Sequence, residues 1–270
     1  MNRRELVQGM GAAALTYKAP QLLFLEGNLA LKERAEREPK PFDAVCLTFH
    51  DLESEDIVLQ NIFYLLEDGY NPISVRDICN HYSGLDDLSG EKSFLVTLDD
   101  GLKSQKHALT AVSYIERVRG EQVPLLFAVM AFNSVSRDDE IALDSPTYVE
   151  SGPPSNNSHE YFTKADLLAI LGNGQHDLAN HTLNHANLPT LTKKNLQGEL
   201  EITQSRIKQL YLEAERREGP PNVLIYPYGE FNDRVIAEVK RQGFEIAFST
   251  EESSHHTTET RYHLGRTGRT

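Results

Sequence analysis

The chain has 270 residues, of which 39% are hydrophobic and 25% are charged, so it can bury a sizeable core and is not expected to be disordered. It carries 40 acidic and 27 basic side chains, a net charge of −13, which argues against nucleic acid and anionic membrane surfaces as partners because both need clustered positive charge. Two cysteines exclude a disulfide-dense scaffold and a zinc site of four thiolates. No run of about 18 apolar residues is present, so no transmembrane segment is predicted.

Residues 1–40 differ in pattern from the rest of the chain. Arg3 and Arg4 precede a short apolar stretch at residues 9–17. Paired arginines before an apolar segment are typical of an export signal, although an amphipathic helical arm would also explain them. We predict an N-terminal segment that is a degenerate export signal or a helical arm, followed by one domain over residues 41–270. Export to the periplasm, cell envelope or medium is favoured, and a cytoplasmic location stays open.

The predicted elements alternate between short apolar runs, typical of buried strands, and longer segments with helical periodicity. In chain order they are a strand at Ala44–Phe49, a helix at Glu55–Leu66, a strand at Phe94–Leu98, a helix at Ser104–Val118, a strand at Pro124–Phe132, a long loop at Asn133–Tyr161, helices at Lys164–Leu171 and Lys193–Arg217, a strand at Val223–Tyr226, a helix at Asp233–Gln242 and a strand at Glu245–Ser249. Thr163 and Asp166 are spaced as a capping pair for the helix that follows them. This alternation predicts an α/β protein with a parallel sheet, either open or closed into a barrel.

A pair of acidic residues, Asp99 and Asp100, directly follows a predicted buried strand and precedes Gly101. The carboxyl ends of such strands are where α/β sheets and barrels build their active sites. Two adjacent carboxylates repel each other unless a cation or hydrogen bonds intervene. We therefore predict a metal site with a proton-accepting role here. The other two Asp-Asp pairs of the chain lie in turn-like contexts and are expected to be solvated.

Two histidines, His181 and His185, are four residues apart. This spacing puts two imidazoles on one side of a helical turn, as a chelating pair requires, although two solvated or capping histidines would show it too. Two histidines and one aspartate can hold Zn²⁺ or a similar ion and leave positions open for water, whose pKa the metal lowers toward ~7. The turn Tyr226–Gly229 follows a strand and either ends it or holds an oxyanion through the Tyr228 N–H.

Three motifs together resemble those of the polysaccharide deacetylases, the NodB-homology group called carbohydrate esterase family 4. Thr97-Leu98-Asp99-Asp100-Gly101 resembles the first motif of that family, usually Thr-Phe-Asp-Asp-Gly. The segment His181–His185 resembles its His-(Ser/Thr)-x-x-His motif, and Tyr226-Pro227-Tyr228-Gly229 resembles the end of its third motif. The match covers about Asp43 to Thr250. It implies a distorted (β/α) barrel, commonly with seven strands, and removal of N-acetyl groups from N-acetylglucosamine-type residues of a polysaccharide or oligosaccharide.

The resemblance implies a role for each matching residue. Asp100, His181 and His185 would bind a divalent metal, with Zn²⁺ favoured, and Asp99 would be the general base. The acetamide oxygen would lie near the Tyr228 backbone N–H, with Tyr226 and Pro227 as further substrate contacts.

The chain also departs from the family pattern. Ile225 stands where most relatives have an Arg that braces the catalytic Asp, the Trp of the fourth motif is absent, and the Leu-x-His of the fifth has no secure counterpart. An aliphatic residue before Tyr-Pro-Tyr-Gly, together with Phe49-His50-Asp51, resembles the branch that acts on poly-N-acetylglucosamine-like exopolysaccharides. His50 and His263 are therefore the candidates for a general acid or a substrate contact. A non-catalytic carbohydrate-binding relative and a metal-assisted hydrolase of another amide or ester are the alternative functions.

Overall fold

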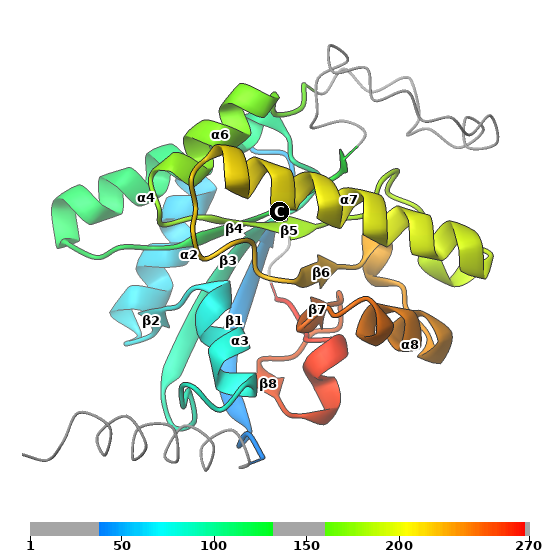
Figure 1. Cartoon of the computed structure of the whole chain (residues 1–270). Coiled ribbons are helices and arrows are strands. Elements are labelled where there is room, and N and C mark those ends of the chain that lie inside the picture. The colour runs from blue at the N-terminus through cyan, green and yellow to red at the C-terminus, as the bar shows by residue number, and fades with distance from the viewer. Residues whose placement is uncertain (1–37, 132–159, 268–270) are drawn as a thin grey trace, which may run out of the picture. The chain divides into compact units, whose positions relative to one another are not determined.

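The protein was analysed as a computed structural model that describes residues 38–131 and 160–267. Figure 1 shows a strongly curved central sheet with most of the helices packed around its outer side. The strands are β1 (Phe42–Phe49), β2 (Asn71–Pro72), β3 (Lys92–Leu98), β4 (Leu125–Val129), β5 (Asp177–Asn180), β6 (Val223–Ile225), β7 (Ile246–Phe248) and β8 (His255–His256). The helices are α2 (Asp56–Glu67), α3 (Val75–Tyr82), α4 (Lys106–Arg119), α6 (Lys164–Gly172), α7 (Lys193–Glu213) and α8 (Asp233–Arg241).

The strand order is β7-β6-β5-β4-β3-β1-β8, with β2 beside β3. All pairings from β1 through β3 to β7 are parallel, and only β8 runs antiparallel, against β1. Near the C-terminus, Leu264 forms a parallel bridge with Phe248 of β7, and Thr267 forms one with Leu47 of β1. The segment 264–267 thus contacts both edges of the run from β1 to β7. The predicted distorted (β/α) barrel with seven strands is confirmed.

The side chains of each strand alternate between the inside of the barrel and the helix layer. In β3, Phe94, Val96 and Leu98 pack with α2, α4 and α6, whereas Leu95 packs in a second cluster with inward-facing residues of β1, β4, β5, β6 and β7. The inward-facing residues include small ones such as Ala128 and Ala179, as the narrow interior of a barrel requires. Continuing this alternation past Leu98 places the next side chain inside the barrel at its carboxyl end.

Most predicted elements are present with boundaries shifted by a few residues. The predicted capping pair is confirmed, since Thr163 and Asp166 form a capping box at the start of α6. The predicted helix at Lys193–Arg217 ends earlier, at Glu213. Some elements were not predicted from the sequence. They include α3, which begins with a capping box of Ser74 and Asp77, and β5.

Two sequence predictions fall largely outside the described residues. These are the N-terminal segment, apart from residues 38–40, and the loop Asn133–Tyr161, apart from its last two residues. In the part of the chain that is described, no helix has both the length and the apolar character needed to cross a membrane.

Candidate active site

The three predicted metal ligands meet at the carboxyl ends of β3 and β5. Oδ1 of Asp100 lies 3.4 Å from Nε2 of His181 and 3.5 Å from Nε2 of His185, and the three ligand atoms lie within 4.8 Å of one another. His181 is buried, while Asp100 and His185 are partly exposed, so the cluster opens to solvent on one side. Two imidazoles and a carboxylate are a donor set suited to Zn²⁺ with positions left for water.

The acidic pair occupies a sharp turn at the end of β3. Asp99 continues the inward side of the strand and is 2% exposed. Asp100 has φ 75° and Gly101 has φ 68°, so two successive residues adopt the left-handed conformation, which is unfavourable for a residue with a Cβ. The turn directs the two neighbouring carboxylates to different places: Asp99 into the barrel, Asp100 toward the histidines.

The two histidines lie on a loop after β5, and the predicted helical turn between them is wrong. Thr182 has φ 68° and His185 has φ 54°, which breaks any helical repeat between the imidazoles. Nδ1 of His181 lies 2.8 Å from the backbone oxygen of Ile225. A backbone acceptor at Nδ1 holds a proton there, which leaves Nε2, the nitrogen that faces Asp100, as the one that can bind a metal once it has lost its own proton.

The electrostatics of the cluster also suit a cation. Burial raises the pKa of Asp100, but the hydrogen bond and the charge of His181, with His185, lower it to about 2. Burial and the neighbouring His181 lower the pKa of His185 to about 4. Near neutral pH the site therefore offers an ionised carboxylate and a neutral His185 imidazole, the forms that bind metal.

Asp99 forms a buried ion pair that the sequence did not reveal. Nη1 of Arg266 lies 2.8 Å from Oδ1 of Asp99 and 3.2 Å from Oγ1 of Thr97, and Nε of Arg266 donates to the backbone oxygen of Ser249 at 2.9 Å. Burial raises the pKa of Asp99, but the charges of Arg266 and His181 hold it below its usual value. Arg266 thus reaches the carboxylate that an Arg at the position of Ile225 would brace. It comes from the segment 264–267 that joins the edges of the barrel.

The two predicted general-acid candidates lie in different surroundings. Nε2 of His50 lies 3.8 Å from Oδ2 of Asp99, and the His50 side chain is 53% exposed. His263 instead lies with its Nδ1 3.0 Å from Oε2 of Glu251, and its ring stacks on Phe231 at 5.0 Å between centroids. The structure therefore brings His50, and not His263, to the acidic pair.

The turn after β6 places one aromatic side chain beside the candidate metal ligands. Tyr228 is 62% exposed, has φ 60°, and its ring meets the edge of His185 at 4.5 Å between centroids. Gly229 is required next to it, because a Cβ there would collide with Thr250. Tyr226 is fully buried, with its hydroxyl bonded to the backbone oxygen of Tyr262, and Pro227 is buried as well. Of the three predicted substrate contacts, only Tyr228 presents its side chain at the surface.

A buried glutamine also supports the site, and no feature of the sequence pointed to it. The side-chain nitrogen of Gln105 donates to the backbone oxygens of Asp99 and His50, and so it ties the ends of β3 and β1 together. The sequence signal for such a residue is weak, because a polar side chain in an amphipathic segment is ordinarily solvated.

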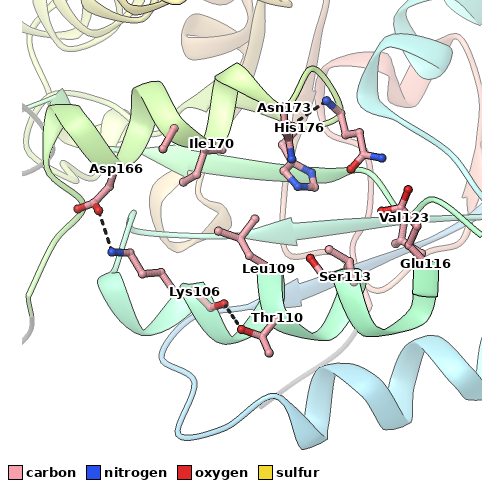
Figure 2. A pocket seen from close by; sticks show the side chains of 13 residues that line it. Lys106, Leu109, Thr110, Ser113, Glu116, Val123, Asp166, Ile170, Asn173 and His176 are labelled. Carbon is pink, nitrogen blue, oxygen red and sulfur yellow. Dashed lines mark hydrogen bonds and ion pairs between the residues drawn. The ribbon is translucent and has the colours of Figure 1, made fainter. Parts of the chain in front are cut away.

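A separate hollow of about 410 Å³ lies between α4 and α6 (Figure 2). Its lining includes the ion pair of Lys106 and Asp166, 2.7 Å apart, and His176 before β5. It contains none of the candidate metal ligands, and Asp99 and His50 do not line it. The clustered chemistry of the described residues is therefore at the carboxyl ends of the strands and not in this hollow.

Comparisons with known proteins agree with the fold and the motifs. The sequence profile of the polysaccharide deacetylase family matches residues 87–247. IcaB from Ammonifex degensii superposes with a TM-score of 0.64 at 18% identity, over 85% of this chain and 92% of that one. The Streptococcus pyogenes deacetylase PplD, solved with acetate, superposes with a TM-score of 0.64 at 14% identity, over 85% and 93%.

BC0361, a polysaccharide deacetylase from Bacillus cereus, superposes with a TM-score of 0.64 at 16% identity. The match covers 84% of this chain but only 65% of the length of that protein. No curated protein sequence matches the chain. At these identities the structural likeness shows the fold, while the family profile covers more than half of the chain. The chain belongs to the polysaccharide deacetylase family.

Proposed function

We propose that the protein is a metal-dependent hydrolase that removes N-acetyl groups from N-acetylglucosamine-type residues of a polysaccharide. One observation carries this proposal: the cluster of Asp100, His181 and His185 lies next to a buried, ionised Asp99, one of whose carboxylate oxygens accepts no hydrogen bond from the described residues. Oδ1 of Asp99 is bound by Arg266, while no described residue donates a hydrogen bond to Oδ2. A general base for water needs a carboxylate beside the metal site with one oxygen that is free to accept a proton.

The proposed metal ligands are Asp100, His181 and His185, with Zn²⁺ as the ion that their donor atoms suit best. A divalent metal held there would lower the pKa of a water ligand toward ~7 and polarise the acetamide oxygen. The orientation of His181 by the backbone oxygen of Ile225 supports this assignment, because ligating histidines ordinarily use their second nitrogen in this way.

The remaining residues account for the proton transfers. Asp99 would accept a proton from the attacking water, and Arg266 keeps it ionised and fixed in place. His50, half-exposed and 3.8 Å from Asp99, would deliver a proton to the leaving amine. Gly229 and Glu230 donate their backbone N–H groups within the turn, but no described residue accepts from the N–H of Tyr228. That N–H is the proposed donor to the developing oxyanion.

The experiment is acetate release from N-acetylglucosamine oligomers by purified protein, with and without chelator, together with its metal content. We expect about one metal ion per chain and acetate release that stops on chelation and returns with zinc. Metal binding without acetate release from any glycan would instead indicate a carbohydrate-binding relative. Rapid turnover of simple aryl acetates alone would indicate a different ester hydrolase. A polysaccharide substrate of this kind would be found at the cell surface. We therefore also propose that the protein is exported.

A further inference from the structure

We propose that Glu199 of α7 is a positioning residue that holds the loop His181–His185 in the conformation needed to bind metal. This inference rests on the proposed metal site. Glu199 is 1% exposed. Its Oε2 accepts hydrogen bonds from the backbone N–H groups of Leu183 and Asn184, each at 2.9 Å, and its Oε1 accepts from the side-chain nitrogen of Asn184, also at 2.9 Å. Both carboxylate oxygens are thus satisfied by the residues between the two histidines.

The loop needs such support because its backbone conformation is energetically unfavourable by itself. Thr182 and His185, the residues that flank Leu183 and Asn184, both have positive φ, although neither is glycine. Residues with a Cβ hold this conformation only where their surroundings impose it. The N–H of Thr182 is taken by Oδ1 of Asn180 at 2.8 Å, so three successive N–H groups point to side-chain acceptors.

The burial of Glu199 makes this support specific. A buried polar group that loses its hydrogen-bond partners is strongly unfavourable, so the loop cannot leave its observed shape without leaving the side-chain oxygens of Glu199 and its own N–H groups unpaired. Glu238 of α8 is a natural comparison. It is also buried, at 5% exposed, but it accepts from Arg241 and Gln242 of its own helix region and does not contact the loop.

The test is Zn²⁺ affinity of the metal-free full chain, measured by competition with a chromophoric chelator, and the visible absorption of the Co²⁺-loaded protein. Glu199→Asp keeps the charge but withdraws the carboxylate from the loop. We expect it to weaken zinc binding by about 10- to 100-fold and to change the Co²⁺ spectrum, as loss of groups that orient metal ligands does. Glu199→Gln keeps the length, and Asn184 can rotate its amide to meet it. We expect its affinity to stay near that of the wild type.

The matched control is Glu238→Asp, which shortens a buried glutamate elsewhere and should leave zinc affinity unchanged. The proposal is overturned if Glu199→Asp, shown to be folded by circular dichroism, binds zinc and gives a Co²⁺ spectrum like the wild type. It is also overturned if Glu199→Gln and Glu199→Asp exchange their expected order, since charge and not reach would then matter. Wild-type protein that binds no zinc would refute the metal site itself. Wild-type protein that binds zinc but releases no acetate would refute only the proposed function.

Discussion

Two buried aspartates at opposite ends of the barrel are both paired with arginine, but they differ in how many of their carboxylate oxygens accept hydrogen bonds. Asp177, the first residue of β5, accepts from Nε and Nη2 of Arg76 at 2.9 and 2.8 Å and from the hydroxyl of Tyr211 at 2.6 Å. Asp99, at the carboxyl end of β3, accepts from one described side chain, Arg266, through Oδ1, while Oδ2 faces His50 at 3.8 Å. Asp177 has both oxygens in hydrogen bonds, whereas Oδ2 of Asp99 accepts none from the described residues, which suits its proposed role as a base.

The difference shows that an ion pair by itself does not identify an active site. Both carboxylates are almost fully buried, and a buried charge is costly unless an opposite charge lies beside it. What distinguishes Asp99 is an oxygen that no described donor occupies and the candidate metal-ligand cluster beside it. We expect substitutions at the carboxyl end of the barrel, around Asp99, to reduce activity. Substitutions at the other end, around Asp177, should reduce stability instead.

The largest effect is expected at the reactive carboxylate. Asp99→Asn removes the proposed base but keeps the shape of the side chain, so kcat should fall by about 10²- to 10⁴-fold or more. Metal content should be unchanged, because Asp99 is not a ligand in this assignment. Steady-state deacetylation and zinc content of the same preparation provide the measurement. Loss of the metal instead would show that Asp99 and Asp100 have been assigned the wrong way round.

The candidate acid beside it should behave in the same way. His50→Gln removes the proton donor near Asp99 and should lower kcat by about 10²- to 10⁴-fold with the metal retained. His263→Gln is the control, because that ring lies on Phe231 and Glu251, and its activity should stay close to the wild type. Comparable losses in the two variants would contradict the choice of His50 over His263.

At the other end of the barrel the effect should be on folding. Asp177→Asn leaves Arg76 without its charge partner and removes one of the two carboxylates beside Arg216, which still pairs with Glu218; breaking a buried pair of this kind costs about 3–5 kcal/mol. Urea denaturation should show this loss in the free energy of unfolding, while kcat/KM of the folded fraction stays near that of the wild type. A selective loss of kcat would mean that this end of β5 contributes to the reaction.

Arg266 connects stability with catalysis and should change the pH profile. Its charge holds the pKa of Asp99 below the usual value, so in Arg266→Gln burial is left to raise that pKa. Because the base must be ionised, the acidic limb of kcat/KM should move to higher pH, and each unit by which the pKa rises lowers the rate below it about tenfold. Arg266→Lys should move the limb less. An unmoved limb in Arg266→Gln would refute this electrostatic role.

The smallest effect concerns His176, the neighbour of Asp177. Burial lowers the pKa of His176 from 6.5 to about 4, so below pH 6.5 the unfolded chain binds a proton that the folded protein does not. The free energy of unfolding should therefore fall between about pH 6.5 and pH 4. His176→Asn keeps an acceptor for the N–H of Leu125 and should lose roughly 2 kcal/mol less than the wild type between about pH 7 and pH 5. Identical pH dependence of the two proteins in urea denaturation would contradict it.

The sequence was most informative where chemistry and local structure coincide. The apolar run before Asp99 and Asp100 indicated a buried strand with two carboxylates at its end, and the fold confirms that placement. The spacing of His181 and His185 indicated a pair of ligands but suggested a helical turn. The loop that actually joins them has positive φ at two residues, which depends on hydrogen bonds to Asn180 and Glu199 and cannot be read from spacing.

By itself, then, the sequence determined the α/β class, the family motifs and which residues form the candidate metal cluster, because these depend on periodicity and on short segments. The tertiary structure alone decided which arginine meets Asp99. Arg266 lies 167 positions from Asp99 along the chain, and it reaches the carboxylate only because the segment 264–267 joins the two edges of the sheet. The tertiary structure also showed that His50, and not His263, lies beside Asp99. Proximity across strands is set by the order and register of the sheet, and the sequence around either histidine does not reveal it.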